Sequence, residues 1–133
     1  MMSILARVGI GLAVSAALPA AAMAQANWTP AAEVLGLPIQ VTTNGVTNTV
    51  YLDPGGQLRI ITPGGNTVPG TWTAANGQLC MTVNGVQECV PYAAPFQAGQ
   101  PVTMTSSCAA NETWLAANTN APPAQGAAPE RGR

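Results

Sequence analysis

The sequence predicts an all-β fold: a small antiparallel meander of about six to seven short strands, closed like a barrel or packed as a sandwich. Turn residues recur from Leu37 onward about every eight to twelve positions, the spacing of short strands joined by tight turns. Apolar and polar residues alternate between these turns, as in strands with one buried face. Two Asn-Gly pairs, at residues 44–45 and 84–85, lie between such segments and indicate β-hairpins.

The first hairpin joins residues 37–43 to residues 46–52. A type I′ turn needs positive φ at both central residues, which Asn44 and Gly45 tolerate. With these two residues in the loop, the apolar side chains fall mostly on one face, and a slip of one position would scatter them. The expected facing pairs are Leu37 with Leu52, Ile39 with Val50, and Val41 with Asn48.

Less regular segments complete the predicted domain. Residues 57–62 and 67–73 have strand character, but Pro69 cannot donate to a sheet ladder. We therefore expect the second of these strands to be an edge, or to be bulged or interrupted at Pro69. Residues 102–105 could supply a last strand, and residues 111–118 a short helix or a strand. Near the N-terminus, residues 29–33 could form a short helical turn with Thr29 as N-cap.

The second hairpin, around Asn84 and Gly85, places Cys80 directly opposite Cys89 by the same counting. Cα atoms of such a non-hydrogen-bonded pair lie about 4.5 Å apart, which is compatible with a disulfide. We interpret the face with the two cysteines as the outer one and the opposite, apolar face as the core face. Glu88 is the misfit on that apolar face.

The third cysteine, Cys108, has no counterpart in this scheme. It could be a free reactive thiol or form an intermolecular bridge, or it could be buried and inert, or replace a partner in the disulfide. We favour the inert and structural interpretations. A redox enzyme is not expected, because no cation lies nearby in sequence to lower a thiol pKa. The C-x8-C spacing of Cys80 and Cys89 is not that of a redox motif, and three cysteines without histidine make a poor metal site.

Residues 1–24 predict a secretory signal peptide, with Arg7, an apolar run over residues 8–18, and an A-x-A cleavage site at residues 22–24. The run is shorter than the roughly 20 residues that span a bilayer. We expect cleavage after Ala24 and a periplasmic or secreted protein. Gln25 follows, where a lipoprotein needs a cysteine, so we expect no membrane association after cleavage.

The predicted organisation has four parts. A signal peptide at residues 1–24 is followed by an N-terminal extension at 25–36 and the β domain at 37–118. A Pro/Ala/Gly-rich tail at 119–133 carries too little apolar surface to fold, and we expect it to be disordered.

Composition excludes several functions. The chain has no histidine, four Lys and Arg residues together, and a net charge of −1, so it offers no basic surface for nucleic acid. Without lysine or histidine it lacks the usual nucleophile–base pairs. We expect no enzyme, no cofactor and no metal. The scattered carboxylates Asp53, Glu88 and Glu112 leave a carboxylate enzyme as a remote alternative, if two of them converge in a cleft.

Most of the six aromatic residues are expected in the core of so small a domain. Trp28 and Trp114 lie outside the clear strands and are the better candidates for a surface that binds a partner.

The segments Gly70-Thr71-Trp72, Leu79-Cys80 and Cys89-Val90-Pro91-Tyr92 resemble small exported proteins of Gram-negative bacteria with a G-x-W, L-C, C-x-x-Y arrangement. The resemblance spans residues 35–108 and implies a periplasmic β domain, but transfers no catalytic or binding residue.

The leading hypothesis is a monomeric, non-enzymatic binding module for an unknown protein or small ligand. One alternative is an inhibitor of an exported hydrolase that presents the turns at residues 53–56 and 63–66. The others are a structural or envelope-stress protein without a discrete site, and the carboxylate enzyme.

Overall fold

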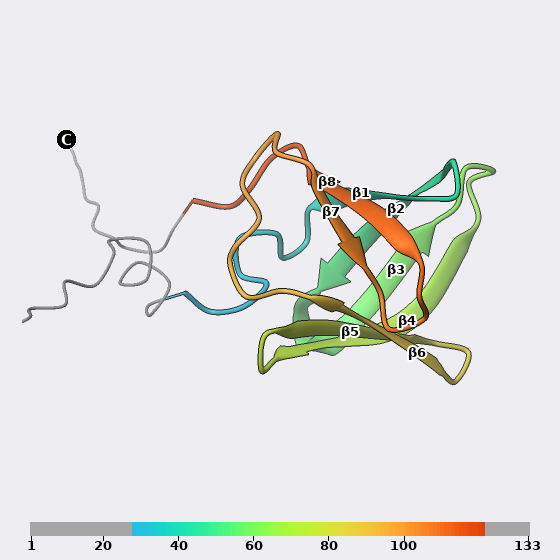
Figure 1. Cartoon of the computed structure of the whole chain (residues 1–133), viewed down its shortest axis with the longest axis horizontal. Coiled ribbons are helices and arrows are strands. Elements are labelled where there is room, and N and C mark those ends of the chain that lie inside the picture. The colour runs from blue at the N-terminus through green and yellow to red at the C-terminus, as the bar shows by residue number, and fades with distance from the viewer. Residues whose placement is uncertain (1–27, 122–133) are drawn as a thin grey trace, which may run out of the picture.

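The computed structural model describes residues 28–121 of the 133-residue chain. The predicted signal peptide, its cleavage site and residues 122–133 lie outside the described residues. Residues 28–121 form eight antiparallel strands in one nearly closed, barrel-like sheet without an α-helix (Figure 1). The predicted all-β class is confirmed. The sheet is a barrel and not a sandwich, and its described strands number eight instead of six or seven.

Short connections join most of the strands, and a single 3-10 turn, η1 (Pro54–Gly56), links the second strand to the third. The strands are β1 (Pro38–Thr43), β2 (Val46–Asp53), β3 (Gln57–Ile61), β4 (Thr67–Ala75), β5 (Gln78–Val83), β6 (Val86–Pro91), β7 (Val102–Thr105) and β8 (Asn111–Ala116). Residues 111–118, for which a helix or a strand was expected, therefore supply a strand.

The first six strands form the predicted meander, and β8 returns to pair with β1, which gives the order β6-β5-β4-β3-β2-β1-β8-β7. The two end strands, β6 and β7, face each other across what we call the β6–β7 seam. No ladder joins them, but the Ser107 amide donates to the Cys89 carbonyl oxygen at 2.8 Å. The Cys89 amide in turn donates to Ser107 Oγ at 2.9 Å. The segment after β7 thus closes the barrel at one place.

Both Asn-Gly hairpins have the predicted register. Ile39 faces Val50 and Val41 faces Asn48 in the first, and Leu79 faces Val90 in the second. All four turn residues have positive φ, as a type I′ turn demands: 51° and 78° at Asn44 and Gly45, 52° and 81° at Asn84 and Gly85. The apolar residues of each hairpin consequently face the barrel interior.

Strand β4 runs without interruption through Pro69, which faces Arg59 of β3. Its pairing with β5 begins only at Thr71, so β4 has a neighbour on one side alone at the proline. The prediction of an edge is correct for this stretch and wrong for the strand as a whole. The following residue, Gly70, faces the interior where β5 approaches, and an added Cβ there would lie 2.4 Å from the Thr82 carbonyl oxygen.

Residues 28–36 close one end of the barrel and belong to its core. Ala31 and Val34 are fully buried. The backbone forms successive i→i+3 turns, and Ala31 has φ of 76°, which a helix does not allow. The predicted helical turn at residues 29–33 is therefore wrong, because this segment bends to cover the barrel end.

Stacked aromatic rings fill the same end. The Trp28 ring meets the Tyr92 ring edge-on at 5.1 Å, and Tyr92, Phe96 and Trp114 stack in succession at 5.1 and 5.8 Å. The Glu33 carboxylate accepts hydrogen bonds from Trp28 Nε1 at 2.8 Å, from the Tyr92 hydroxyl at 2.5 Å, and from the Phe96 amide at 2.8 Å. Burial and the bond to Glu33 raise the pKa of Tyr92. One carboxylate thus ties residues 28–36 to the segment after β6.

The first residues of the predicted tail are ordered against this closed end. The Asn120 side chain donates to the carbonyl oxygens of Ala32 and Leu35 at 3.0 and 3.1 Å, and its amide donates to that of Glu33 at 2.7 Å. The expected boundary at residue 119 is therefore too early.

Candidate functional site

The opposite end of the barrel is open. Connections at residues 44–45, 62–66, 84–85 and 106–110 gather there, because successive connections of an antiparallel meander alternate between the two ends. A pocket of about 390 Å³, half open to solvent, lies at this end. Its lining comprises Ile60, Met81, Val83, Val86, Glu88 and Cys108. The site is thus an apolar pocket with one carboxylate and one thiol.

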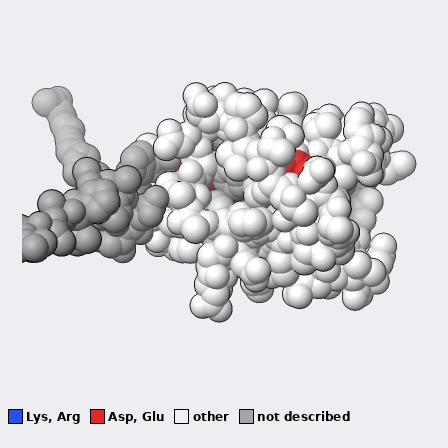
Figure 2. Space-filling view, viewed as in Figure 1, with Lys and Arg blue, Asp and Glu red and all other residues white. Residues whose placement is uncertain are grey.

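The surface around the pocket is almost uncharged. Charged residues make up 7% of the chain, and Figure 2 shows only small red areas and no blue on the face in view. Two valines on the strands that leave the Asn-Gly turns, Val46 and Val86, are 48% and 64% exposed. This end therefore offers apolar contacts to a ligand.

A pair of glutamates lies next to the pocket inside the barrel. Glu88 of β6 lines the pocket, and Glu112 of β8 is only 4% exposed. Glu112 lies near Glu88 and accepts a hydrogen bond from Trp114 Nε1 at 2.9 Å. Burial raises the pKa of Glu112 to about 7, and the neighbouring Glu88 adds to the rise while the Trp114 bond opposes it. Glu112 therefore keeps its proton at mildly acidic pH.

The sequence placed Glu88 on the core face, and the structure explains that misfit by its contact with Glu112. The structure thus brings two of the three scattered carboxylates, Glu88 and Glu112, near each other inside the barrel. The third scattered carboxylate, Asp53, forms an ion pair with Arg59 on the outer face. The hydrogen bond from the Arg59 guanidinium lowers the pKa of Asp53.

The raised pKa predicts how stability depends on pH. Between about pH 4.5 and 7 the folded protein keeps a proton on Glu112 that the unfolded chain has released, so stability falls as pH rises through this window. A pKa raised from 4.5 to about 7 corresponds to a loss of up to about 3 kcal/mol. We expect urea midpoints to drop between pH 5 and pH 8 in the native protein and to stay constant in Glu112→Gln. An equal drop in both proteins would contradict this assignment.

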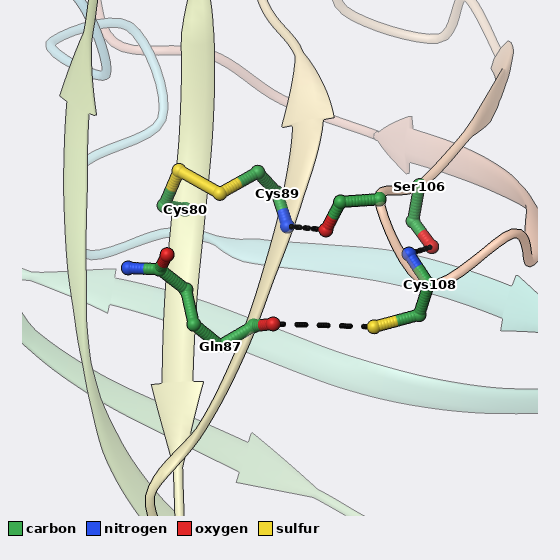
Figure 3. The surroundings of a disulfide bond; sticks show 6 residues. Cys80, Gln87, Cys89, Ser106 and Cys108 are labelled. Carbon is green, nitrogen blue, oxygen red and sulfur yellow. Dashed lines mark hydrogen bonds between the residues drawn. A yellow bond between two sulfur atoms is a disulfide. The ribbon is translucent and has the colours of Figure 1, made fainter.

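The predicted disulfide between Cys80 and Cys89 is confirmed, with Cα atoms 4.0 Å apart on facing positions of β5 and β6 (Figure 3). The described residues include all three cysteines, and Cys108 is unpaired and exposed. The favoured interpretation of Cys108 as buried, or as a partner in the disulfide, is wrong. It lies in the connection from β7 to β8, where its Sγ is 3.9 Å from the Gln87 carbonyl oxygen. The sequence alone did not indicate that this connection crosses the seam to β6.

This arrangement predicts selective labelling. We expect a thiol reagent to add one label to Cys108 in the folded, non-reduced protein, because this thiol alone is free and exposed. After unfolding and reduction we expect three labels. Intact-mass measurement distinguishes the two states, and Cys108→Ser should carry no label when folded. Labelling of the folded Cys108→Ser protein would contradict the disulfide.

Trp28 and Trp114 do not form the exposed partner surface that the sequence analysis expected. Trp114 is fully buried in the aromatic stack, and Trp28 is half-buried with its Nε1 bound to Glu33. Trp114 is inward because Glu112, Trp114 and Ala116 alternate on the buried face of β8. This alternation could have indicated that Trp114 is buried. It was not decisive, because the same residues were equally compatible with a helix.

Comparison with known proteins gives no relative. No protein-family model, no curated protein and no solved structure matches the chain. In residues 28–121 no helix is long and apolar enough to cross a membrane. The same residues contain no cluster of three or more His, Cys, Asp or Glu side chains that could hold a metal ion.

Proposed function

We propose that this chain is an exported, non-enzymatic binding module that holds a small apolar ligand in the open end of its barrel. The observation that carries the proposal is the pocket of about 390 Å³ with a wall of aliphatic side chains. Stacked aromatic rings fill the other end of the barrel.

Export is supported by the leader-like residues 1–24 and by the disulfide, because disulfides persist in oxidising compartments such as the periplasm and the exterior. Inhibition of a hydrolase is the weaker candidate, since the turns at residues 53–56 and 63–66 lie at opposite ends of the barrel and cannot present one joint surface.

A neutral apolar fluorophore, N-phenyl-1-naphthylamine, tests the pocket. We expect saturable binding with enhanced fluorescence at one site per chain. Val86→Asp, at the rim of the pocket, should weaken binding severalfold, because the added carboxylate loses part of its hydration when an apolar ligand covers it.

Val102→Asp is the matched control. Val102 is 39% exposed on β7 and lies outside the pocket lining, so the same substitution should leave binding unchanged. Equal weakening by both substitutions, or no saturable binding to the native protein, would refute the proposal.

A further inference from the structure

Among the described residues that line the pocket, Glu88 is the only one with a charged side chain. The other lining residues are four apolar side chains and the Cys108 thiol. Along β6, Val86, Glu88 and Val90 alternate on the inner face, and exposure falls from 64% at Val86 to 1% at Val90. Glu88 lies between these two valines and is half-buried. Its carboxylate is therefore one step inside the rim, where it is partly removed from water.

No basic side chain among the described residues compensates this negative charge. Arg59 is the one lysine or arginine between positions 28 and 121, and it forms an ion pair with Asp53 on the outer face of the barrel. Its neighbour in β3, Ile60, lies on the opposite face of the strand and lines the pocket. The nearby Glu112 supplies no positive charge in either protonation state, because a carboxyl group is neutral or negative. The pocket is thus apolar with a net negative charge.

This charge discriminates between apolar ligands by their head groups. A neutral ligand that covers Glu88 removes water from the carboxylate without replacing its hydrogen bonds, which is unfavourable. A ligand that carries a carboxylate or phosphate adds charge repulsion. An ammonium group replaces the lost water with charge-assisted hydrogen bonds, and these are stronger where water is partly excluded.

The neighbours of Glu88 define both the head group and the rest of the ligand. Met81 faces Glu88 across the β5–β6 ladder, and Ile60 and Val83 complete the wall beside them. A hydrocarbon chain that follows the head group therefore contacts these three apolar side chains. The lining contains no aromatic ring, so it lacks the cage that typically holds quaternary ammonium groups. A primary ammonium group instead has three N–H donors for a carboxylate.

We propose that the pocket selects primary alkylamines, bound as ammonium ions with the head group at Glu88 and the hydrocarbon chain against the aliphatic wall. This inference rests on the proposed function, because it requires that the open end of the barrel binds apolar molecules. It adds the charge of the ligand, and it excludes fatty acids and other anionic amphiphiles.

NMR titration of the native protein with three ligands of equal chain length tests the selectivity. At about pH 7.5 and low ionic strength, hexylamine is an ammonium ion, hexanol is neutral and hexanoate is an anion. We expect hexylamine to bind about fivefold or more tightly than hexanol, the effect of one favourable ion pair, and hexanoate to bind most weakly. The amide signals of Met81 and Glu88 should shift with hexylamine, because both residues line the pocket.

Glu88→Gln is the decisive variant, because it keeps the shape of the side chain and removes its charge. The ratio of hexylamine to hexanol affinity should fall to about one. Asp53→Asn is the matched control, since it removes the same charge from the outer face and should leave the ratio unchanged. Added salt should weaken the binding of hexylamine and not that of hexanol. This salt measurement needs no variant and serves if Glu88→Gln fails to fold.

The outcomes separate this inference from the proposed function. No preference for hexylamine in the native protein, a preference kept in Glu88→Gln, or an equal loss in Asp53→Asn would each overturn the inference. If hexanol and N-phenyl-1-naphthylamine bind while hexylamine binds no more tightly, the inference fails and the proposed function stands. If none of the three ligands binds, both are wrong.

Discussion

Gly70→Ala should destabilise the protein by more than about 3 kcal/mol, beyond the usual cost of overpacking a core. The added Cβ would lie 2.4 Å from the Thr82 carbonyl oxygen and 3.0 Å from side-chain carbons of both Leu58 and Val83. A backbone oxygen cannot rotate away as a flexible side chain can, so β4 and β5 must separate where their pairing begins. Urea unfolding of the non-reduced protein measures the loss, with a lower midpoint expected at unchanged slope.

Gly64→Ala is the matched control. Gly64 lies in the connection from β3 to β4, with nothing within 4 Å of an added Cβ. We expect a change within about 0.5 kcal/mol, as at other exposed positions. Similar midpoints for both variants would show that β5 does not approach β4 at Gly70.

Glu33→Ala should cost on the order of 3 kcal/mol and should loosen the closed end of the barrel. The substitution removes three hydrogen bonds to one carboxylate, and bonds to charged groups contribute about 1.5–3 kcal/mol each before water compensates the exposed donors. The Tyr92 hydroxyl would lose its acceptor in a buried setting. Urea midpoints followed by tryptophan fluorescence should report the loss, since Trp28 is one of the donors.

Asp53→Ala provides the comparison for Glu33→Ala. It removes a carboxylate of similar size from an ion pair with Arg59 on the outer surface. Exposed ion pairs contribute little because water competes for both groups, so the midpoint should hardly move. If Asp53→Ala proved as harmful as Glu33→Ala, the closed end would not depend on the Glu33 hydrogen bonds.

Local patterns predicted the parts of the fold that form between neighbours in sequence. The Asn-Gly turns fixed both hairpin registers, because two residues with positive φ leave one way to pair the flanking strands. The Cys80–Cys89 disulfide followed from the same counting, across a sequence separation of 9. The candidate partner surface failed because Trp114 belongs to a segment whose strand could not be distinguished from a helix by its own residues.

Turn geometry and alternation act over a few residues, so they were enough to predict the strand class, the two hairpins and the disulfide. The closure of the barrel by β8 on β1, the exposure of Cys108 and the proximity of Glu88 to Glu112 became visible only in the folded chain. These contacts join residues far apart in the chain, and they depend on how all the strands curve and pack together. The alternation within a strand carries no information about contacts between distant strands. The pocket and the two neighbouring glutamates therefore could not be predicted from it.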